Sequence, residues 1–270
     1  MTTAVDFEAI KKTQRAGWET GDYPRVGNTL QIIAERLVEA ADVRAGQRVL
    51  DVACGQGNAA LAAARRFAVA TGVDYATNLL AQGRERAAAE HLDVRFEEGD
   101  AEALPLPDAA FDLVLSTVGV MFAPDHQRAA DELVRVTAPG GKIALASWTP
   151  PSLVGAMFKV IGSFAPPPAG VKPPALWGTT DHLATLFGDR VEWVSRTTRE
   201  FVFRYHSPQH FAEWFIEFYG PITRLAGILP AEDAARFAAE LAEVARRYDK
   251  ADDDTLAAPS EYLEVVGIRR

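Results

Sequence analysis

A short segment near residue 50 constrains the fold more than any other part of this chain. An apolar run ends in Asp51, and Gly55 and Gly57 follow within six residues. Such a run is typical of a buried strand, and glycine lets the next stretch of backbone reach positive φ and approach a ligand closely. Residues 58–67 then read as a helix, whose first N–H groups attract anionic groups. The segment therefore predicts a strand, a loop and a helix around a small, polar, partly anionic ligand.

The same rhythm of strand and helix continues from Gln47 to Trp148. Short apolar runs alternate with helical segments, which predicts βαβ units and a parallel sheet with helices on both faces. Pro139-Gly140-Gly141 predicts a sharp turn from the last of these helices into the strand that follows. The expected strands are residues 48–52, 68–73, 94–97, 111–116 and 142–147, and the expected helices are 58–67, 76–90 and 125–136.

The regions on either side of this core are expected to be mostly helical. Residues 7–41 read as helices around a break at 17–27. Beyond Trp148, proline clusters surround an apolar helical segment, and Ser207-Pro208 is a strong helix start. The later elements are expected as helices at 153–164, 180–187, 210–219, 222–228 and 231–248, and as strands at 191–205 and 261–268.

Composition and charge exclude several classes of protein. The chain has 270 residues with 48% hydrophobic and 24% charged content, which is ordinary for a globular fold. Its net charge of −9, with basic residues dispersed among acids, argues against a nucleic-acid-binding face. One cysteine cannot form an intrachain disulfide, which fits a reducing compartment. With no signal-peptide profile and no apolar run of about 18 residues, we expect a cytoplasmic protein without a membrane span.

Three acids are predicted to lie where the first three strands of the sheet end. Because ligands of an open parallel sheet bind outside the carboxyl ends of its strands, Asp51, Asp74 and Asp100 are expected to share one crevice. Asp51 is suited to accept hydrogen bonds from N–H groups of the loop, and Asp74 from both hydroxyls of a ribose. Asp100 is suited to accept from an exocyclic amine while the N–H of Ala101 donates to a ring nitrogen. The arrangement predicts an adenosine pocket beside the glycine loop.

A dinucleotide-binding enzyme is the alternative interpretation. Residues 55–60 satisfy the pattern G-x-G-x-x-A, and Asp74 follows at nearly the expected distance. The additional acids Asp51 and Asp100 favour S-adenosylmethionine over NAD, because a sulfonium cation and an adenine amine tolerate an acidic pocket, whereas a pyrophosphate does not call for one. An NAD-type oxidoreductase on a similar sheet and a non-catalytic cofactor-binding protein stay as alternatives.

The chain carries four motifs, at residues 50–60, at 72–74, at 99–108 with 111–114, and at 135–136 with 139–141. In their order and spacing they resemble a class I S-adenosylmethionine-dependent methyltransferase of the type-11 group, similar to ubiquinone/menaquinone-biosynthesis methyltransferases. One departure is Ala53, which stands where the fullest family pattern has a first glycine. The resemblance implies a doubly wound, mostly parallel, seven-stranded Rossmann-like sheet with an antiparallel last strand. It also implies methyl transfer by in-line displacement to a small-molecule acceptor, which we expect to be apolar or aromatic.

The resemblance also implies which residues would contact S-adenosylmethionine or its product, S-adenosylhomocysteine. Asp74 with Tyr75 would bind the ribose, and Asp100 with Ala101 would bind the adenine. Residues 18–23 resemble a segment that closes over the cofactor. The expected cofactor contacts are Trp18, Tyr23, Asp51, Ala53, Cys54, Gly55, Gly57, Asn58, Asp74, Tyr75, Asp100 and Ala101, with Ser116 and Thr117 near the methionine part.

His126 is the candidate for a general base, because it follows the fourth strand near the expected entrance for the acceptor. An exposed histidine in the first turn of a helix is the simpler explanation. The five histidines form no set with metal-ligand spacing, since His206 and His210 lack a companion acid, and we expect no metal. Cys54 is expected to be a small buried residue rather than a nucleophile, because no partner base is identifiable.

An aromatic helix near residue 215 is the candidate wall for the acceptor. Its aromatic residues recur at helical spacing, which mostly indicates a buried face and also fits the wall of a hydrophobic pocket. The sequence does not select carbon, oxygen or nitrogen as the methylated atom. The expected acceptor contacts are Phe122, Trp148, Phe211, Trp214 and Tyr219.

We expect one integrated domain in three parts. Residues 1–45 would form a helical cap over the cofactor, and residues 46–149 the S-adenosylmethionine-binding core. Residues 150–270 would complete the sheet and carry an acceptor-binding lid at 207–249. Within that lid, the amphipathic helix at 231–248 is explained by ordinary packing and leaves a lid contact or a homodimer contact open.

Overall fold

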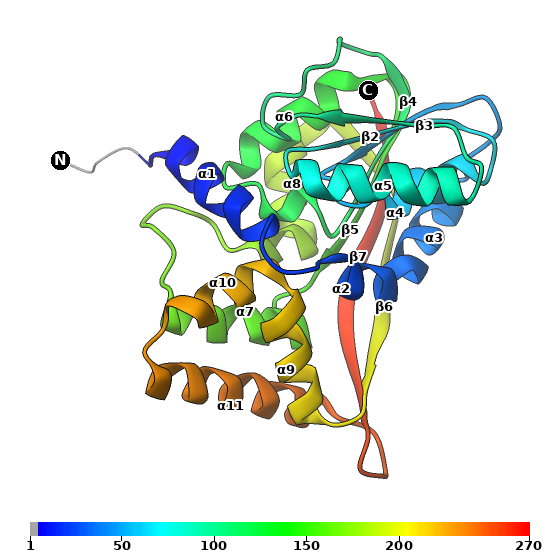
Figure 1. The fold of residues 1–270 in the computed structure, drawn as a ribbon. Coiled ribbons are helices and arrows are strands. Elements are labelled where there is room, and N and C mark those ends of the chain that lie inside the picture. Colours follow the sequence, from blue (N-terminus) through cyan, green and yellow to red (C-terminus); the bar gives the residue numbers. More distant parts are fainter. Residues whose placement is uncertain (1–4) are drawn as a thin grey trace.

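A seven-stranded sheet organises the computed structural model, which describes residues 5–270 (Figure 1). Its strands are β1 (Arg48–Val52), β2 (Val69–Asp74), β3 (Val94–Glu98), β4 (Phe111–Thr117), β5 (Thr137–Trp148), β6 (Val191–Tyr205) and β7 (Leu256–Arg269). They follow the order β3-β2-β1-β4-β5-β7-β6. β1 to β5 pair in parallel, and β7 is antiparallel to both β5 and β6. The predicted mostly parallel sheet with an antiparallel last strand is confirmed.

Helices cover both faces of the sheet and extend beyond one end of it (Figure 1). The N-terminal helices are α1 (Phe7–Trp18), α2 (Pro24–Gly27) and α3 (Gln31–Ala40), with the short 3-10 helix η1 (Asn28–Leu30) between the last two. The core helices are α4 (Asn58–Ala64), α5 (Thr77–Ala89) and α6 (His126–Val136), with η2 (Val120–Phe122) before the last. The C-terminal part adds α7 (Leu153–Phe164), η3 (Pro174–Gly178), α8 (Thr180–Phe187), η4 (Gly188–Arg190), α9 (Pro208–Phe218), α10 (Gly220–Ile228) and α11 (Ala231–Tyr248).

The N-terminal segment packs against the C-terminal helices at the same end of the sheet. α1 contacts α10, and α2 contacts α9. The first contact is close because two glycines meet in it, since a Cβ on Gly220 would lie 2.1 Å from the carbonyl oxygen of Gly17. Segments that are about 200 residues apart in the sequence thereby form one wall above the carboxyl ends of the strands.

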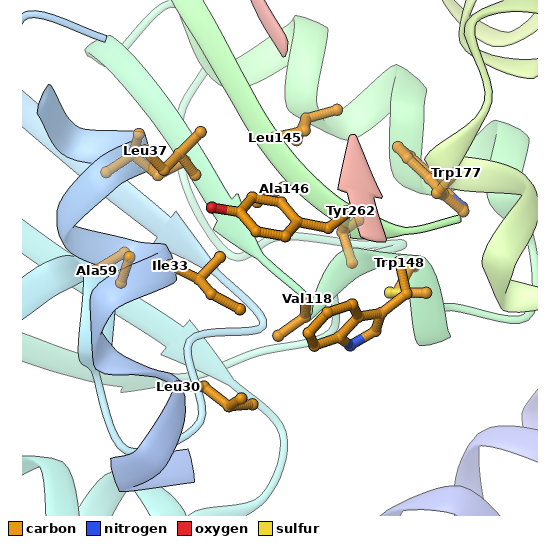
Figure 2. Close-up of a cluster of buried hydrophobic side chains, with 14 of the residues drawn as sticks. Leu30, Ile33, Leu37, Ala59, Val118, Leu145, Ala146, Trp148, Trp177 and Tyr262 are labelled. Carbon is orange, nitrogen blue, oxygen red and sulfur yellow. The ribbon is translucent and has the colours of Figure 1, made fainter. Parts of the chain in front are cut away.

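Buried apolar side chains fix the position of α3 against the sheet. Ile33 and Leu37 of α3 are fully buried, as are Leu145 of β5 and Tyr262 of β7. Figure 2 shows the ring of Tyr262 pointing from β7 toward α3. Each fully buried side chain of this size contributes about 1.5–3 kcal/mol to folding. This packing places α3 against β4 and β5.

Three elements, α4, β5 and β7, begin or end three residues or more from the predicted bounds. α4 ends at Ala64 instead of residue 67, because Phe67 has a left-handed φ of 62°. β5 begins at Thr137, and its register against β4 is irregular, so that the predicted turn at residues 139–141 lies within this strand. β7 is longer than predicted and pairs with β6 through Pro259, a residue that usually ends a strand.

No helix in the described part of the chain is both long enough and apolar enough to cross a membrane.

Candidate functional site

The carboxyl ends of the first three strands open into a cavity with an empty volume of about 900 Å³, its open mouth included. It lies where the strand order reverses between β1 and β4, the usual ligand position in such sheets. The three predicted acids all line it, so the structure brings them together. The predicted residues in its lining are Trp18, Tyr23, Asp51, Ala53, Cys54, Gly55, Asn58, Asp74, Tyr75, Asp100, Ala101, Thr117 and Phe122. We call this space the strand-end cavity.

Asp51 joins β1 to the helix that follows the glycine loop. Its side chain is 2% exposed, and its Oδ2 accepts a hydrogen bond from the N–H of Ala60 in the first turn of α4 at 3.0 Å. Burial and, to a smaller extent, the nearby carboxylate of Asp74 raise the pKa of Asp51 to about 7, against the opposing effect of the hydrogen bond from Ala60. Asp51 therefore anchors the start of α4.

Replacing Asp51 with asparagine is expected to change how stability depends on pH. The pKa of Asp51 is about 7 in the folded protein and 3.8 without the fold, so between these values the folded state binds more protons than the unfolded state. The free energy of unfolding of the wild type therefore falls as pH rises through this window, by at most about 1.4 kcal/mol per pH unit. The variant lacks this titration.

Urea unfolding of both proteins from about pH 4 to about pH 8 measures the effect. The difference in unfolding free energy, variant minus wild type, should increase with pH and level off above about pH 7. A difference that stays constant with pH would contradict the burial argument for Asp51.

Asp74 holds the glycine loop from the end of β2. Its Oδ2 accepts from the N–H of Gly55 and its Oδ1 from the N–H of Ala76, each at 2.8 Å. Burial raises the pKa of Asp74, and these hydrogen bonds oppose the shift. Because each carboxylate oxygen can accept a second hydrogen bond, the partly buried side chain keeps acceptor positions toward the cavity.

The glycine loop requires a left-handed backbone at three positions. Ala53 has φ 52°, Gly55 has φ 53° and Gly57 has φ 81°. A Cβ on Gly57 would lie 2.7 Å from the ring of Phe96, whereas a Cβ on Gly55 would meet no atom closer than 3.8 Å. Gly57 is therefore needed for packing and lies outside the cavity lining, while Gly55 forms part of that lining. The left-handed φ of Ala53 explains why glycine is suited to this position.

Ser116 and Thr117 end β4 with different orientations. Ser116 is buried, donates to the carbonyl of Val52 at 2.7 Å and accepts from the N–H of Val120 at 2.9 Å, so it lies outside the cavity lining. Thr117 lines the cavity, and its buried hydroxyl has no hydrogen-bond partner among the described residues. Buried polar groups nearly always have partners, so the Thr117 hydroxyl is available to a ligand.

Asp100 has a partner that the sequence analysis missed. The ammonium of Lys11, on α1, lies 2.6 Å from Oδ2 of Asp100 and 3.2 Å from Oε2 of Glu102. Lys11 is only 8% exposed and lines the strand-end cavity. A lysine on an amphipathic helix usually points to solvent, and its partners are 89 and 91 positions away, so no local pattern identifies it.

The structure does not bring His126 to the strand-end cavity. Its imidazole is 2% exposed, and its Nδ1 lies 2.8 Å from Nε2 of His182 on α8. Burial lowers the pKa of His126 to about 3. His126 is therefore not the exposed first-turn histidine that was the simpler prediction. It is neutral near pH 7 and joins α6 to α8.

Cys54 is a buried thiol in the cavity lining. It is 9% exposed, and burial raises its pKa well above the usual value, which disfavours the thiolate. No group of three or more histidine, cysteine, aspartate or glutamate side chains within residues 5–270 is placed to hold a metal ion.

A second cavity, with an empty volume of about 360 Å³, adjoins the first. Trp18, Tyr23 and Phe122 line both, and the ring of Trp18 contacts that of Phe122 edge to face at 5.0 Å between centroids. None of the described residues that line it is charged. The residues that line only this second cavity are Val26, Trp148, Val154, Met157, Phe158, Phe203, Phe215 and Tyr219. We call it the apolar cavity.

Three of the five predicted acceptor contacts line the apolar cavity: Phe122, Trp148 and Tyr219. Phe211 is fully buried against Phe203 and does not reach it, and Trp214 also lies outside its lining. Helical spacing identified the buried face of α9 correctly, but it could not show which turn of that face reaches a cavity. No individual residue of α7 was predicted as an acceptor contact, because its apolar residues are also explained by core packing.

Comparisons with known proteins agree with this geometry. Residues 50–145 match a family described as "Methyltransferase domain". An uncharacterized protein of Mycobacterium tuberculosis is 40% identical over 253 residues, which cover 92% of each chain. Demethylmenaquinone methyltransferase of Thermus thermophilus is 43% identical over 118 residues, which cover 43% of this chain and 54% of that protein.

Two solved structures share the fold. A putative methyltransferase of Bacillus halodurans superposes with a TM-score of 0.62 at 18% identity and covers 87% of this chain and 97% of that one. The YcgJ protein of Bacillus subtilis has a TM-score of 0.60 at 19% identity and covers 88% of this chain and 98% of that one.

Proposed function

Because this chain belongs to the type-11 group of class I S-adenosylmethionine-dependent methyltransferases, we propose that its strand-end cavity binds S-adenosylmethionine and its apolar cavity binds the methyl acceptor. The observation that carries this proposal is the convergence of Asp51, Asp74 and Asp100 on a cavity that shares an aromatic wall with an apolar one. The acids would complement the cofactor, and the aromatic wall would separate cofactor from acceptor.

The lining of the strand-end cavity fits this cofactor. Asp74 keeps acceptor positions for the two ribose hydroxyls, and Asp100 and Ala101 lie beyond it for the adenine. The unpartnered hydroxyl of Thr117 is suited to the polar methionine part. The carboxylates in the lining are compatible with the positive sulfonium and amino groups.

The first turn of α4 argues against the NAD alternative. A dinucleotide places its pyrophosphate on the N–H groups at the start of this helix. Here the carboxylate of Asp51 already accepts from the N–H of Ala60 in that turn. A pyrophosphate would have to compete with this side chain for the N–H groups of the turn, so the arrangement favours S-adenosylmethionine.

The composition of the apolar cavity supports an uncharged, apolar or aromatic acceptor. A charged acceptor would lose its hydration there without gaining an ionic partner, at a large cost in free energy. Its lining by the described residues includes no histidine or carboxylate, so we assign His126 a structural role instead of that of a general base. Demethylmenaquinone methyltransferase is a relative, but the match to it covers less than half of this chain. The proposed acceptor class therefore rests on the lining of the apolar cavity and not on that name.

The proposed activity requires the protein to orient its ligands and does not require a catalytic triad. Bound S-adenosylmethionine supplies a methyl carbon that its sulfonium has already activated. The protein's own residues therefore need to orient the acceptor and exclude water. Trp18, Tyr23 and Phe122 lie between the two cavities, where they can do both.

We also propose roles for the parts outside the core. α1 to α3 would cap the cofactor, since Lys11, Trp18 and Tyr23 line the strand-end cavity. The first four residues of the predicted cap lie outside the described part of the chain. α7 and the end of α9 would form the acceptor side, whereas no residue of α11 lines either cavity.

Isothermal titration calorimetry with S-adenosylhomocysteine tests the proposed cofactor. We expect binding of one molecule per chain and no comparable binding of NADH. Thermal protection by NADH without protection by S-adenosylhomocysteine would contradict the proposal and favour the oxidoreductase alternative.

Replacing Phe158 with alanine is expected to weaken binding of an apolar ligand without affecting the cofactor. Phe158 lines only the apolar cavity and packs against Phe122 at 5.7 Å between ring centroids. With 1-naphthol as the probe and S-adenosylhomocysteine present, we expect the probe to bind about tenfold more weakly to the variant, because its ring loses apolar contact area. Affinity for S-adenosylhomocysteine should change less than about twofold. Equal loss of both affinities would show that the two cavities are not separate sites.

A further inference from the structure

The ammonium of Lys11 occupies the centre of a buried ionic cluster at the nucleobase end of the strand-end cavity. It lies 2.6 Å from Asp100 and 3.2 Å from Glu102, whose side chain is fully buried. Glu8, on the same helix, lies 2.6 Å away but is 79% exposed. Lys11 is thus the cation that the described structure places between the two carboxylates of the segment after β3.

This cluster fixes both oxygens of Asp100. Oδ2 accepts from the ammonium of Lys11, and Oδ1 accepts from the N–H of Glu102 at 2.9 Å. The side chain of Asp100 is still 29% exposed, and each oxygen can accept one more hydrogen bond. Because lysine only donates, Asp100 next to it presents acceptors to the cavity and no donor.

Removing the positive charge of Lys11 would release the side chain of Asp100. Two carboxylates, those of Asp100 and Glu102, would then lie close together with no cation between them. Oδ2 of Asp100 would have lost its donor, and the buried carboxylate of Glu102 would repel that of Asp100. The side chain of Asp100 could then rotate away from the position in which its oxygens face the cavity.

We propose that Lys11 is a positioning residue that sets nucleobase specificity, by holding the carboxylate of Asp100 in place as a hydrogen-bond acceptor that selects a 6-amino over a 6-oxo purine. This rests on the proposed function, since it takes the strand-end cavity as the nucleoside site. The 6-amino group of adenine donates to Asp100. The 6-oxo group of hypoxanthine presents a second acceptor, which an ionised carboxylate repels.

Calorimetry with S-adenosylhomocysteine and its deaminated form, S-inosylhomocysteine, tests the proposal. The deaminated base carries a 6-oxo group and a proton on N1, and the N1 difference is the same for every Lys11 variant. The wild type should prefer the amino ligand by about 100-fold, as expected for a hydrogen bond to a charged group against a repulsive contact. Lys11→Met keeps most of the side-chain volume and removes the charge. It should reduce the preference by at least about tenfold.

Three further variants distinguish an effect of Lys11 on ligand preference from an effect on the docking of α1. Lys11→Arg keeps the charge and should keep the preference within about threefold of the wild type. Glu8→Gln removes only the exposed partner and should leave it unchanged. Arg15→Met removes the ion pair to Glu98 that also ties α1 to the end of β3. It should leave the preference intact even if both affinities fall.

Two results with Lys11→Met would overturn the proposal: equal losses of affinity for both ligands, which would mean that Lys11 only docks α1, or tighter binding of S-adenosylhomocysteine, which would mean that Lys11 competes with the adenine. Both results leave the proposed function intact. A wild type that binds neither ligand would overturn the proposed function and this inference with it.

Discussion

Replacing Asp74 with alanine is expected to lower the affinity for S-adenosylhomocysteine by at least about 100-fold. The carboxylate would accept from both ribose hydroxyls, and hydrogen bonds to a charged group are worth about 1.5–3 kcal/mol each. The same side chain accepts from the N–H groups of Gly55 and Ala76, so its removal also releases the loop that lines the cavity. Calorimetry with the wild type and the variant measures the loss.

A matched variant controls for the change in net charge. Asp112→Asn also removes one negative charge, but Asp112 lies at the start of β4, where it binds Arg48 outside both cavities. It should bind S-adenosylhomocysteine within about twofold of the wild type. If Asp74→Ala binds the ligand as well as Asp112→Asn does, the ribose assignment is wrong.

Gly57→Ala is expected to destabilise the fold by about 2–4 kcal/mol. The left-handed φ of 81° costs an alanine about 1 kcal/mol, and its Cβ would lie 2.7 Å from the ring of Phe96, which adds about 1–3 kcal/mol of overpacking. Gly55→Ala meets no such neighbour and should cost only about 1 kcal/mol. Urea unfolding of the two variants measures the contrast.

The two glycines should also differ in their effect on binding. Gly55 lines the strand-end cavity and Gly57 does not, so Gly55→Ala should weaken S-adenosylhomocysteine binding more than Gly57→Ala does in the folded state. Adding Phe96→Leu, which shortens the obstructing side chain, should recover part of the stability of Gly57→Ala. No recovery would contradict the steric explanation.

The order of elements could be predicted because their periodicity is local. The predicted bounds of β1 (Arg48–Val52), α7 (Leu153–Phe164) and β6 (Val191–Tyr205) agree with the structure to the residue. The extra length of β7 was missed because Pro259 usually marks the end of a strand, whereas here it pairs with Val202 opposite. Long-range pairing overrides that local preference.

The candidate site was predictable where topology alone determines position. Three strand ends of a parallel sheet converge, and the structure places Asp51, Asp74 and Asp100 in one cavity. Side-chain direction is not available from topology, so Ser116 was predicted to be near the ligand although its hydroxyl binds the backbone. The position of Lys11 depends on α1 docking against a segment that is 89 residues away.

A crystal structure of the protein with S-adenosylhomocysteine tests the central claim most directly. The account predicts the ribose hydroxyls on the carboxylate of Asp74, the adenine beside Asp100 and Ala101, and the sulfur facing the wall formed by Tyr23 and Phe122. A nucleoside bound outside this cavity, or one whose ribose lies away from Asp74, would contradict it.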